Sequence, residues 1–212
     1  MASHVDLVDM NFVRAAQDLA RGMGAPESKM DFAALKGRLD EIRRENGFPA
    51  AEHSIAVVAR DFDNPRQGAL SRAVEAVGFD VKEVDYRHTF VSQVQDESRH
   101  ADRAPVTLSH WLSYMCGIVA SNSPRSVVVV SGAFELAGPL TDFATRDSEG
   151  RAAVAMFKRL LNKRWIDNGL FDGDLPIEFV NLERNSKELL GVDLRELARR
   201  SEAARRDSSL PI

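Results

Sequence analysis

The stretch RSVVVVSGAFELAGP, residues Arg125–Pro139, decides the fold that this sequence predicts. Four consecutive valines end at Ser131 and Gly132, a pattern typical of a fully buried strand that stops at a small-residue turn. Glu135 follows near the start of a helical segment. A buried strand that leads through a turn into a helix places the turn at the carboxyl edge of an open α/β sheet, where ligands collect.

Strand-like and helical segments alternate along the rest of the chain. Five short segments, either apolar or alternating, are predicted as strands: His4–Asp9, Ser54–Arg60, Phe79–Tyr86, Arg125–Val130 and Pro176–Leu182. Helical spacing predicts the helices Phe12–Met23, Phe32–Glu45, Gln67–Val77, Thr107–Ala120, Phe134–Thr145 and Gly150–Asn168. We therefore expect a three-layer, doubly wound α/β sheet of about five mainly parallel strands, with the first and fourth strands at its centre.

The domain organisation follows from where this alternation stops. Residues 1–186 are predicted to form the α/β domain, and residues 187–212 a charged C-terminal helix, Leu189–Arg206, with a disordered tail. Inside the domain, residues 87–105 are polar and lack a clear period, which predicts a mobile loop or lid.

Composition narrows the functional classes. A formal net charge of -4 over 212 residues argues against a protein that coats nucleic acid by bulk electrostatics, but it allows local basic patches. The single cysteine, Cys116, excludes an internal disulfide and a Cys-rich zinc site. The sequence contains no apolar run of about 18 residues and no secretory signal pattern, so we expect a cytoplasmic protein without membrane contact.

Polar side chains are expected to meet where the central strands end. Asp9 and Asn11 follow the first strand, and Ser131 and Glu135 follow the fourth, so their carboxyl ends bring these residues together at a topological switch point. Further candidate ligand-binding residues come from neighbouring segments: Asp61, Asp63 and His110.

These two motifs resemble the NYN domain, a group within the PIN-like fold of metal-dependent ribonucleases. The resemblance covers roughly Val5–Leu182 in element order. Asp9 and Asn11 match the Asp and nearby Asn of the family's first strand. The family's late motif usually reads Ser-Gly-Asp-x-Asp-Phe, whereas this chain has Ala133 at the first acidic position and Glu135 at the second.

The resemblance implies roles for these residues. Asp9 and Glu135 would be catalytic and hold Mg²⁺ or Mn²⁺, Asn11 would orient water or a ligand, and Ser131 with Gly132 would contact phosphate. Phosphodiester hydrolysis by this route needs several carboxylates around the metal ions. Because one family carboxylate is replaced by alanine and another has no counterpart in residues 107–111, the activity is expected to be weak or lost.

Each of these residues also has a structural interpretation. Asp9 and Asn11 are suitable caps for the helix that follows them, and Glu135 complements a helix dipole. Asp61 and Asp63 precede Asn64-Pro65, as turn residues do. A structural role is favoured for His110 as well.

Basic residues support a second interpretation, nucleic-acid binding. Basic side chains in the 87–105 segment and near Trp165 are suited to phosphate contacts beside an aromatic base stack: Arg87, Arg99, Arg103, Lys158, Lys163 and Arg164. The C-terminal segment adds further arginines, interleaved with acidic residues.

Three functions therefore follow from the sequence. The first is a divergent NYN/PIN-like protein that binds RNA, with weak or lost ribonuclease activity. The second is a non-catalytic structural or interaction domain that binds a protein partner or a second copy. A nucleotide-binding Rossmann-like enzyme is disfavoured because no Gly-rich fingerprint follows Asp9.

Overall fold

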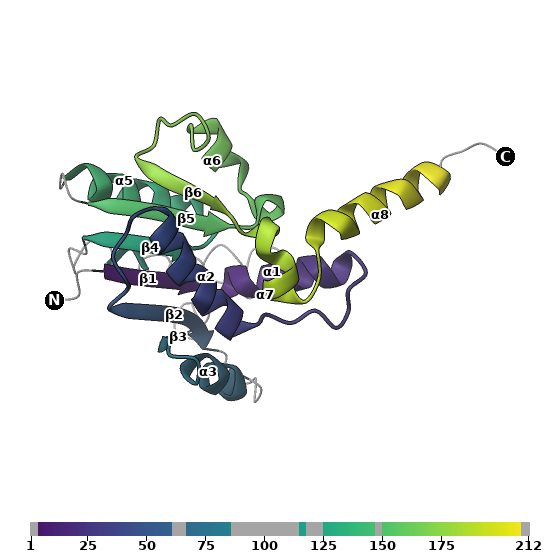
Figure 1. The fold of residues 1–212 in the computed structure, drawn as a ribbon, viewed down its shortest axis with the longest axis horizontal. Coiled ribbons are helices and arrows are strands. Elements are labelled where there is room, and N and C mark those ends of the chain that lie inside the picture. Colours follow the sequence, from purple (N-terminus) through teal and green to yellow (C-terminus); the bar gives the residue numbers. More distant parts are fainter. Residues whose placement is uncertain (1–3, 61–66, 86–114, 118–124, 147–149, 209–212) are drawn as a thin grey trace, which may run out of the picture.

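A parallel β-sheet forms the centre of the structure, and helices pack against it (Figure 1). The computed structural model describes residues 4–60, 67–85, 115–117, 125–146 and 150–208. Within these residues the sheet contains six strands: β1 His4–Asp9, β2 His53–Arg60, β3 Asp80–Asp85, β4 Ser126–Val130, β5 Arg151–Met156 and β6 Ile177–Asn181.

The strand order is β3-β2-β1-β4-β5-β6, and every pairing is parallel. The predicted α/β class is confirmed, as is the central position of β1 beside β4, and β3 lies at one edge. Strand numbers rise in both directions from the β1–β4 pair, so the chain reverses its winding direction there. The carboxyl ends of β1 and β4 therefore form the switch point of the sheet.

Helices connect the strands and cover the sheet. The α-helices in the described residues are α1 Met10–Gly22, α2 Phe32–Glu45, α3 Gln67–Glu75, α5 Ala137–Arg146, α6 Lys163–Asp167, α7 Ser186–Leu190 and α8 Leu194–Ser208. Short 3₁₀ helices in the same described residues are η3 Phe134–Leu136, η4 Lys158–Leu160 and η5 Leu182–Asn185. Figure 1 shows α2 and α5 on opposite faces of the sheet.

Local capping explains where the first two helices begin. The Asp9 side chain caps α1, and the Asp31 side chain caps α2 by accepting a hydrogen bond from the Ala34 amide. Ser28, which precedes this cap, donates to the Leu190 carbonyl of α7. This bond joins the segment before α2 to a helix that lies far along the sequence.

The predicted helix Gly150–Asn168 is wrong. Its first part is β5, buried from Ala152 to Met156 between β4 and β6, and its second part contains η4 and α6. An alanine-rich run has high helix propensity, but a central parallel strand is buried on both faces and needs no alternation. Sheet burial overrides the local preference here, and the sheet gains a sixth strand.

The predicted single helix Leu189–Arg206 is also wrong. The chain forms α7 and α8 as separate helices, because Gly191 adopts a left-handed conformation with φ of 73° at the end of α7. Figure 1 shows α8 extending away from the body of the protein.

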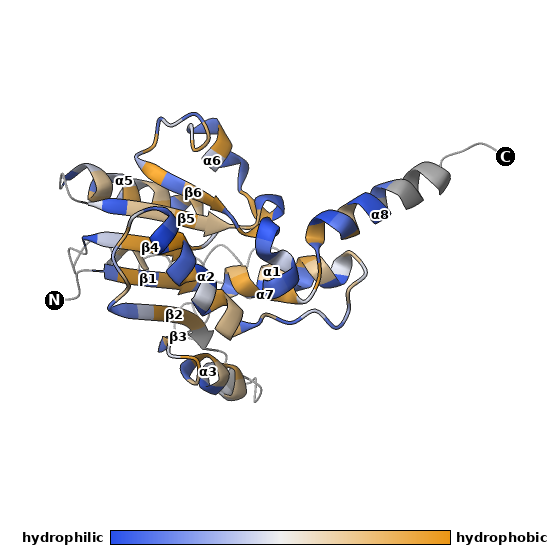
Figure 2. Cartoon of the chain, viewed as in Figure 1, coloured by the Kyte–Doolittle hydropathy of each residue, from blue (hydrophilic) through white to orange (hydrophobic). Residues whose placement is uncertain are grey.

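Apolar residues concentrate along the inner strands and the helix faces that cover them (Figure 2). All five residues of β4 are buried, including the four consecutive valines. In the part of the chain that the structure describes, no helix has the length and apolar character needed to cross a membrane. The predicted lid at residues 87–105 lies outside the described residues, as does most of the predicted helix Thr107–Ala120.

Candidate functional site

The carboxyl ends of β1 and β4 bring Asp9 and Ser131 into direct contact, as predicted. The Ser131 hydroxyl donates to Asp9 Oδ2 at 2.8 Å. The other carboxylate oxygen, Oδ1, accepts from the backbone amides of Asn11 at 2.9 Å and Phe12 at 3.2 Å. Asp9 therefore caps α1 with one oxygen and holds the β4 turn with the other. These contacts match its structural interpretation.

Burial changes the acidity of this carboxyl group. Asp9 is 5% exposed, and burial raises the pKa of Asp9 to about 6, although the hydrogen bonds from Ser131 and the two amides oppose the shift. No cation contributes to this pKa. The geometry therefore places a buried carboxylate beside neutral hydrogen-bond donors.

The turn after β4 is packed tightly against protein. A Cβ atom on Gly132 would lie 2.9 Å from the Phe12 ring and 3.1 Å from the Leu160 carbonyl oxygen. The Gly132 carbonyl accepts a hydrogen bond from Trp165 Nε1 at 3.1 Å. The switch point is thus covered by side chains from α1 and from the segment after β5. Glycine fits here because a Cβ atom would force the Phe12 ring or the Leu160 carbonyl to shift.

Glu135 makes its contact on the protein surface. Its carboxylate lies 3.2 Å from the Arg164 guanidinium, and the two side chains are 45% and 59% exposed. The same guanidinium lies 4.5 Å from the centre of the Phe134 ring, and that ring packs edge-to-face on Trp165. Glu135 therefore belongs to a contact between η3 and α6.

These described residues do not fit a magnesium or manganese centre. Both oxygens of Asp9 accept hydrogen bonds from protein groups, and Glu135 pairs with a cation. Among the residues that the structure places, no three His, Cys, Asp or Glu side chains form a group that could hold a metal ion. Divalent cations of this kind need several oxygen ligands. The metal role of Asp9 and Glu135 stays a prediction that these contacts do not favour.

No family model, curated protein or solved structure matches this chain. The NYN/PIN-like resemblance therefore rests on its two motifs. The six-strand order also occurs in dinucleotide-binding folds, but there a Gly-rich turn follows the first strand. Here Met10, Asn11 and Phe12 follow Asp9 instead, and the Phe12 ring fills the space beside Gly132.

Exposed basic residues lie in the segment that joins β5 to β6, residues 157–176, which we term the basic connection. Lys158 is on η4, while Lys163 and Arg164 are on α6, and all three are exposed. Within the described chain, neither lysine forms an ion pair. These three predicted nucleic-acid-binding residues are thus presented to solvent on one connection.

Two apolar side chains on the basic connection are also exposed. Ile166 is 48% exposed, and Phe171 is 46% exposed with its ring edge-to-face on Phe179 of β6 at 4.9 Å. Neither residue was among the predicted site residues. A signal was present for Phe171, because it lies in a turn-rich segment with Asp172, Gly173 and Asp174.

Asn11 and six residues outside the described chain are the remaining predicted site residues. Asn11 is partly buried and contributes its backbone amide to Asp9. Six others lie outside the described residues: Asp61, Asp63, Arg87, Arg99, Arg103 and His110.

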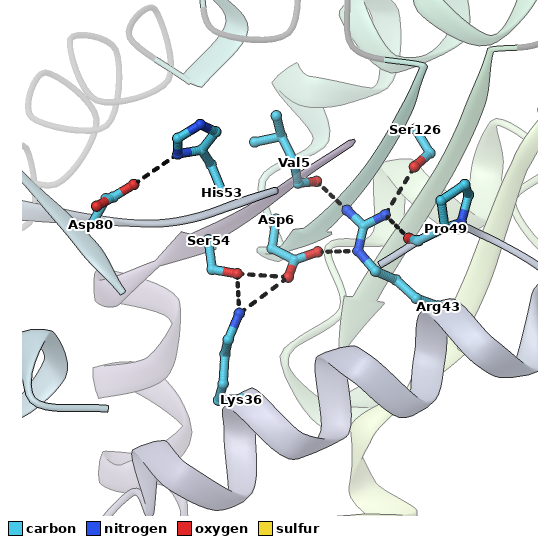
Figure 3. A network of polar contacts seen from close by, with 9 residues as sticks. All are labelled: Val5, Asp6, Lys36, Arg43, Pro49, His53, Ser54, Asp80 and Ser126. Carbon is cyan, nitrogen blue, oxygen red and sulfur yellow. Dashed lines mark hydrogen bonds and ion pairs between the residues drawn. The ribbon is translucent and has the colours of Figure 1, made fainter. Parts of the chain in front are cut away.

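A buried polar network that the sequence did not predict lies nearer the amino ends of the central strands (Figure 3). Asp6 of β1 and Arg43 of α2 are 0% and 1% exposed, and Arg43 Nε lies 2.7 Å from Asp6 Oδ1. The guanidinium also donates to the carbonyls of Val5 and Pro49 and to the Ser126 hydroxyl.

A second set of contacts completes that network. The Ser54 hydroxyl donates to Asp6 Oδ2 at 2.9 Å, and Lys36 Nζ lies 4.0 Å from the same oxygen and donates to Ser54. The His4 ring hydrogen-bonds Ser126 at 3.0 Å. The network fastens α2 to three strands. An aspartate inside a central strand was its signal, because a buried charge needs a partner.

Proposed function

We propose that this protein is a divergent NYN/PIN-like protein that binds RNA through the basic connection, and that Asp9 maintains the fold. The observation that carries the proposal is the exposure of Lys158, Lys163 and Arg164 on one connection, with both lysines free of ion pairs in the described chain. Exposed cations bind phosphate by releasing counterions, and this contact does not depend on base sequence. The choice of RNA comes from the family resemblance.

Arg164 is suited to phosphate because its guanidinium is already positioned. The Phe134 ring supports it from one side at 4.5 Å, so little conformational freedom remains to be lost on binding. A guanidinium can donate two parallel hydrogen bonds to phosphate. Glu135 holds the same group in an exposed ion pair, and such a pair is weak enough for a phosphate to replace.

Phe171 provides an aromatic surface near these cations in sequence. Its ring packs against Phe179 and is half exposed, so part of the ring is accessible to a base. Stacking of a base on an aromatic side chain contributes about 1–3 kcal/mol and tolerates any sequence. Local cations and an aromatic ring can therefore bind single-stranded RNA although the net charge of the protein is -4.

The test is binding of a labelled, mixed-sequence single-stranded RNA, measured by fluorescence anisotropy over a range of salt concentrations. The double variant Lys158→Gln/Lys163→Gln should lower affinity about tenfold near physiological salt and reduce the salt slope by about 1.4, since each lost contact removes about 0.7. The matched control is Arg72→Gln/Lys82→Gln, which removes the same charge from exposed residues of α3 and β3 at the far edge of the sheet.

A variant with the opposite expected effect sharpens this test. Glu135→Gln removes the carboxylate that pairs with Arg164, so RNA affinity should rise severalfold. No binding by the wild-type protein at low salt would overturn the proposal. Equal losses in the Lys158/Lys163 variant and in the control would show that only overall charge matters, and would also overturn it.

Catalysis is tested on the same RNA with Mg²⁺ or Mn²⁺. We expect the RNA to stay intact, because the described carboxylates do not fit a metal centre. Metal-dependent cleavage by the wild-type protein that is abolished by Asp9→Asn would instead establish a ribonuclease.

A non-catalytic protein-interaction domain is the second candidate. It is favoured by Ile166 and Phe171, because exposed apolar side chains on one connection are suited to a protein surface. Concentration-dependent association, measured by analytical ultracentrifugation and removed by Ile166→Ser/Phe171→Ser, would support this candidate. The RNA proposal predicts a monomer under those conditions.

A further inference from the structure

Helix α8 extends from the body of the protein (Figure 1), and its first turns pack against the core. Leu194 and Ala198 are buried, and Leu197 is partly buried against the core. Arg195, Arg199 and Arg200 on the same turns are exposed. Figure 2 shows the coloured part of the helix beyond its first residues as mainly hydrophilic. The first turns of the helix therefore attach it to the core.

Local interactions hold this helix where core packing does not. The Asp193 carboxylate accepts from the amides of Arg195 and Glu196, and Arg200 pairs with Glu196 one turn earlier. A polar helix of fifteen residues gains little else in water, because isolated helices of about 12–15 residues are marginal. A partner along its length would stabilise it.

A chain of hydrogen bonds joins the beginning of α8 to the basic connection. The Leu194 amide donates to the Ser186 hydroxyl at 3.0 Å, and that hydroxyl donates to the Glu183 carbonyl at 2.9 Å. The buried Glu183 side chain accepts from the Arg159 amide at 2.6 Å, and Arg159 follows Lys158 on η4. The base of α8 is thus tied to the turn that carries Lys158.

We infer that α8 is a second arm of the RNA-binding site and that its arginines bind the phosphates of a strand that also contacts the basic connection. This inference rests on the proposed function. Charge indicates the partner, because the helix contains five arginines and three acidic residues, and Arg199 forms no ion pair within the described chain. Fifteen residues give a helix about 22 Å long, which adds a second stretch of contacts to a longer strand.

The experiment compares two single-stranded RNAs, one of about 6 and one of about 14 nucleotides, lengths within the range that single-strand-binding domains cover. In the full-length protein, Arg195→Gln/Arg199→Gln should reduce the affinity for the longer RNA about tenfold and its salt slope by about 1.4, because two phosphate contacts are lost. Affinity for the short RNA should change less than twofold. Arg72→Gln/Lys82→Gln is again the charge-matched control.

A charge-conserving variant separates binding from loss of the helix. Arg195→Lys/Arg199→Lys should keep most of the salt slope for the longer RNA, and circular dichroism checks that both variants retain helix. The inference would be overturned if the Gln variant left the salt slope for the longer RNA unchanged, or if affinity fell equally for both RNA lengths. The basic connection would then remain a binding site. Absence of RNA binding by wild-type protein would overturn the proposed function as well, so the two failures are distinguishable.

Discussion

The pH dependence of folding stability should distinguish the wild-type protein from an Asp9→Asn variant. Asp9 is buried, and burial raises its pKa from 3.8 to about 6. Asparagine keeps an oxygen that accepts the amides at the start of α1, and its amide group can donate to the Ser131 hydroxyl. It carries no charge at any pH, so the variant removes the titration and retains a cap.

The folded state binds the Asp9 proton more tightly than the unfolded state does, and this sets the direction in which stability changes with pH. A raised pKa means that Asp9 contributes stability that is complete below pH 3.8 and is lost as the pH rises through about 6. A difference of about two pKa units corresponds to about 3 kcal/mol, at about 1.4 kcal/mol for each unit. Between about pH 4 and pH 7, the wild-type protein should therefore lose about 2–3 kcal/mol relative to Asp9→Asn.

The measurement is the free energy of unfolding from denaturant titrations at several pH values, with a chelator present and constant ionic strength. The free energies of unfolding of the two proteins are subtracted at each pH, so that the effects of titrating groups common to both proteins cancel. The control is Asp31→Asn, which changes the capping carboxylate of α2 at an exposed position. It should show no comparable change in this window, since burial is the cause at Asp9.

Two results would refute the reasoning. If the difference in free energy of unfolding between the wild-type protein and Asp9→Asn stayed constant with pH, Asp9 would not be a desolvated carboxyl group. A wild-type protein that gains stability relative to Asp9→Asn as the pH rises would show a stabilised carboxylate, as in an ion pair or metal site.

Three further outcomes can be measured on the same protein. Arg43→Met should lower the free energy of unfolding by about 3–5 kcal/mol, because it removes the guanidinium 2.7 Å from the buried Asp6 carboxylate and leaves that carboxylate with only Ser54 and the more distant Lys36; a loss below 1 kcal/mol in denaturant titrations would contradict the network. Gly132→Ala should lower the free energy of unfolding by about 1–3 kcal/mol through overpacking. Gly138→Ala in α5 should be neutral or slightly stabilising, because no atom lies within 4 Å of the added Cβ; thermal unfolding measures both effects. Ser131→Ala should move the pH range in which Asp9 loses its stability contribution upward, since the hydroxyl lowers the pKa of Asp9. An unchanged pH range would be inconsistent with the observed hydrogen bond.

Most of the fold could be predicted from local patterns. The helix Phe32–Glu45 and the strand His4–Asp9 have the predicted bounds, because clear periodicity, a capping residue and a terminating turn agree there. Strand β5 could not be recognised in this way. Its sequence RAAVAM favours a helix locally, and only its place between two other strands gives it an extended conformation.

The candidate site could be predicted in position but not in chemistry. Sheet topology brought Asp9 to Ser131 as expected. The sequence could not show that both oxygens of this carboxylate would be occupied, or that Glu135 would pair with Arg164 from a segment 29 residues away. The Glu135–Arg164 contact depends on how the segment after β5 folds, and that segment was predicted as helix.

The buried network around Asp6 has a consequence for how the central strands align. A run of four valines carries no information about strand register, because a shift of two residues would match valine with valine again. Ser126 precedes that run and receives a hydrogen bond from Arg43, which also binds Asp6 of the neighbouring strand. A sliding β4 would break this bond and leave a buried guanidinium donor unpaired. The uniform apolar strand is thus aligned by the one polar side chain at its beginning.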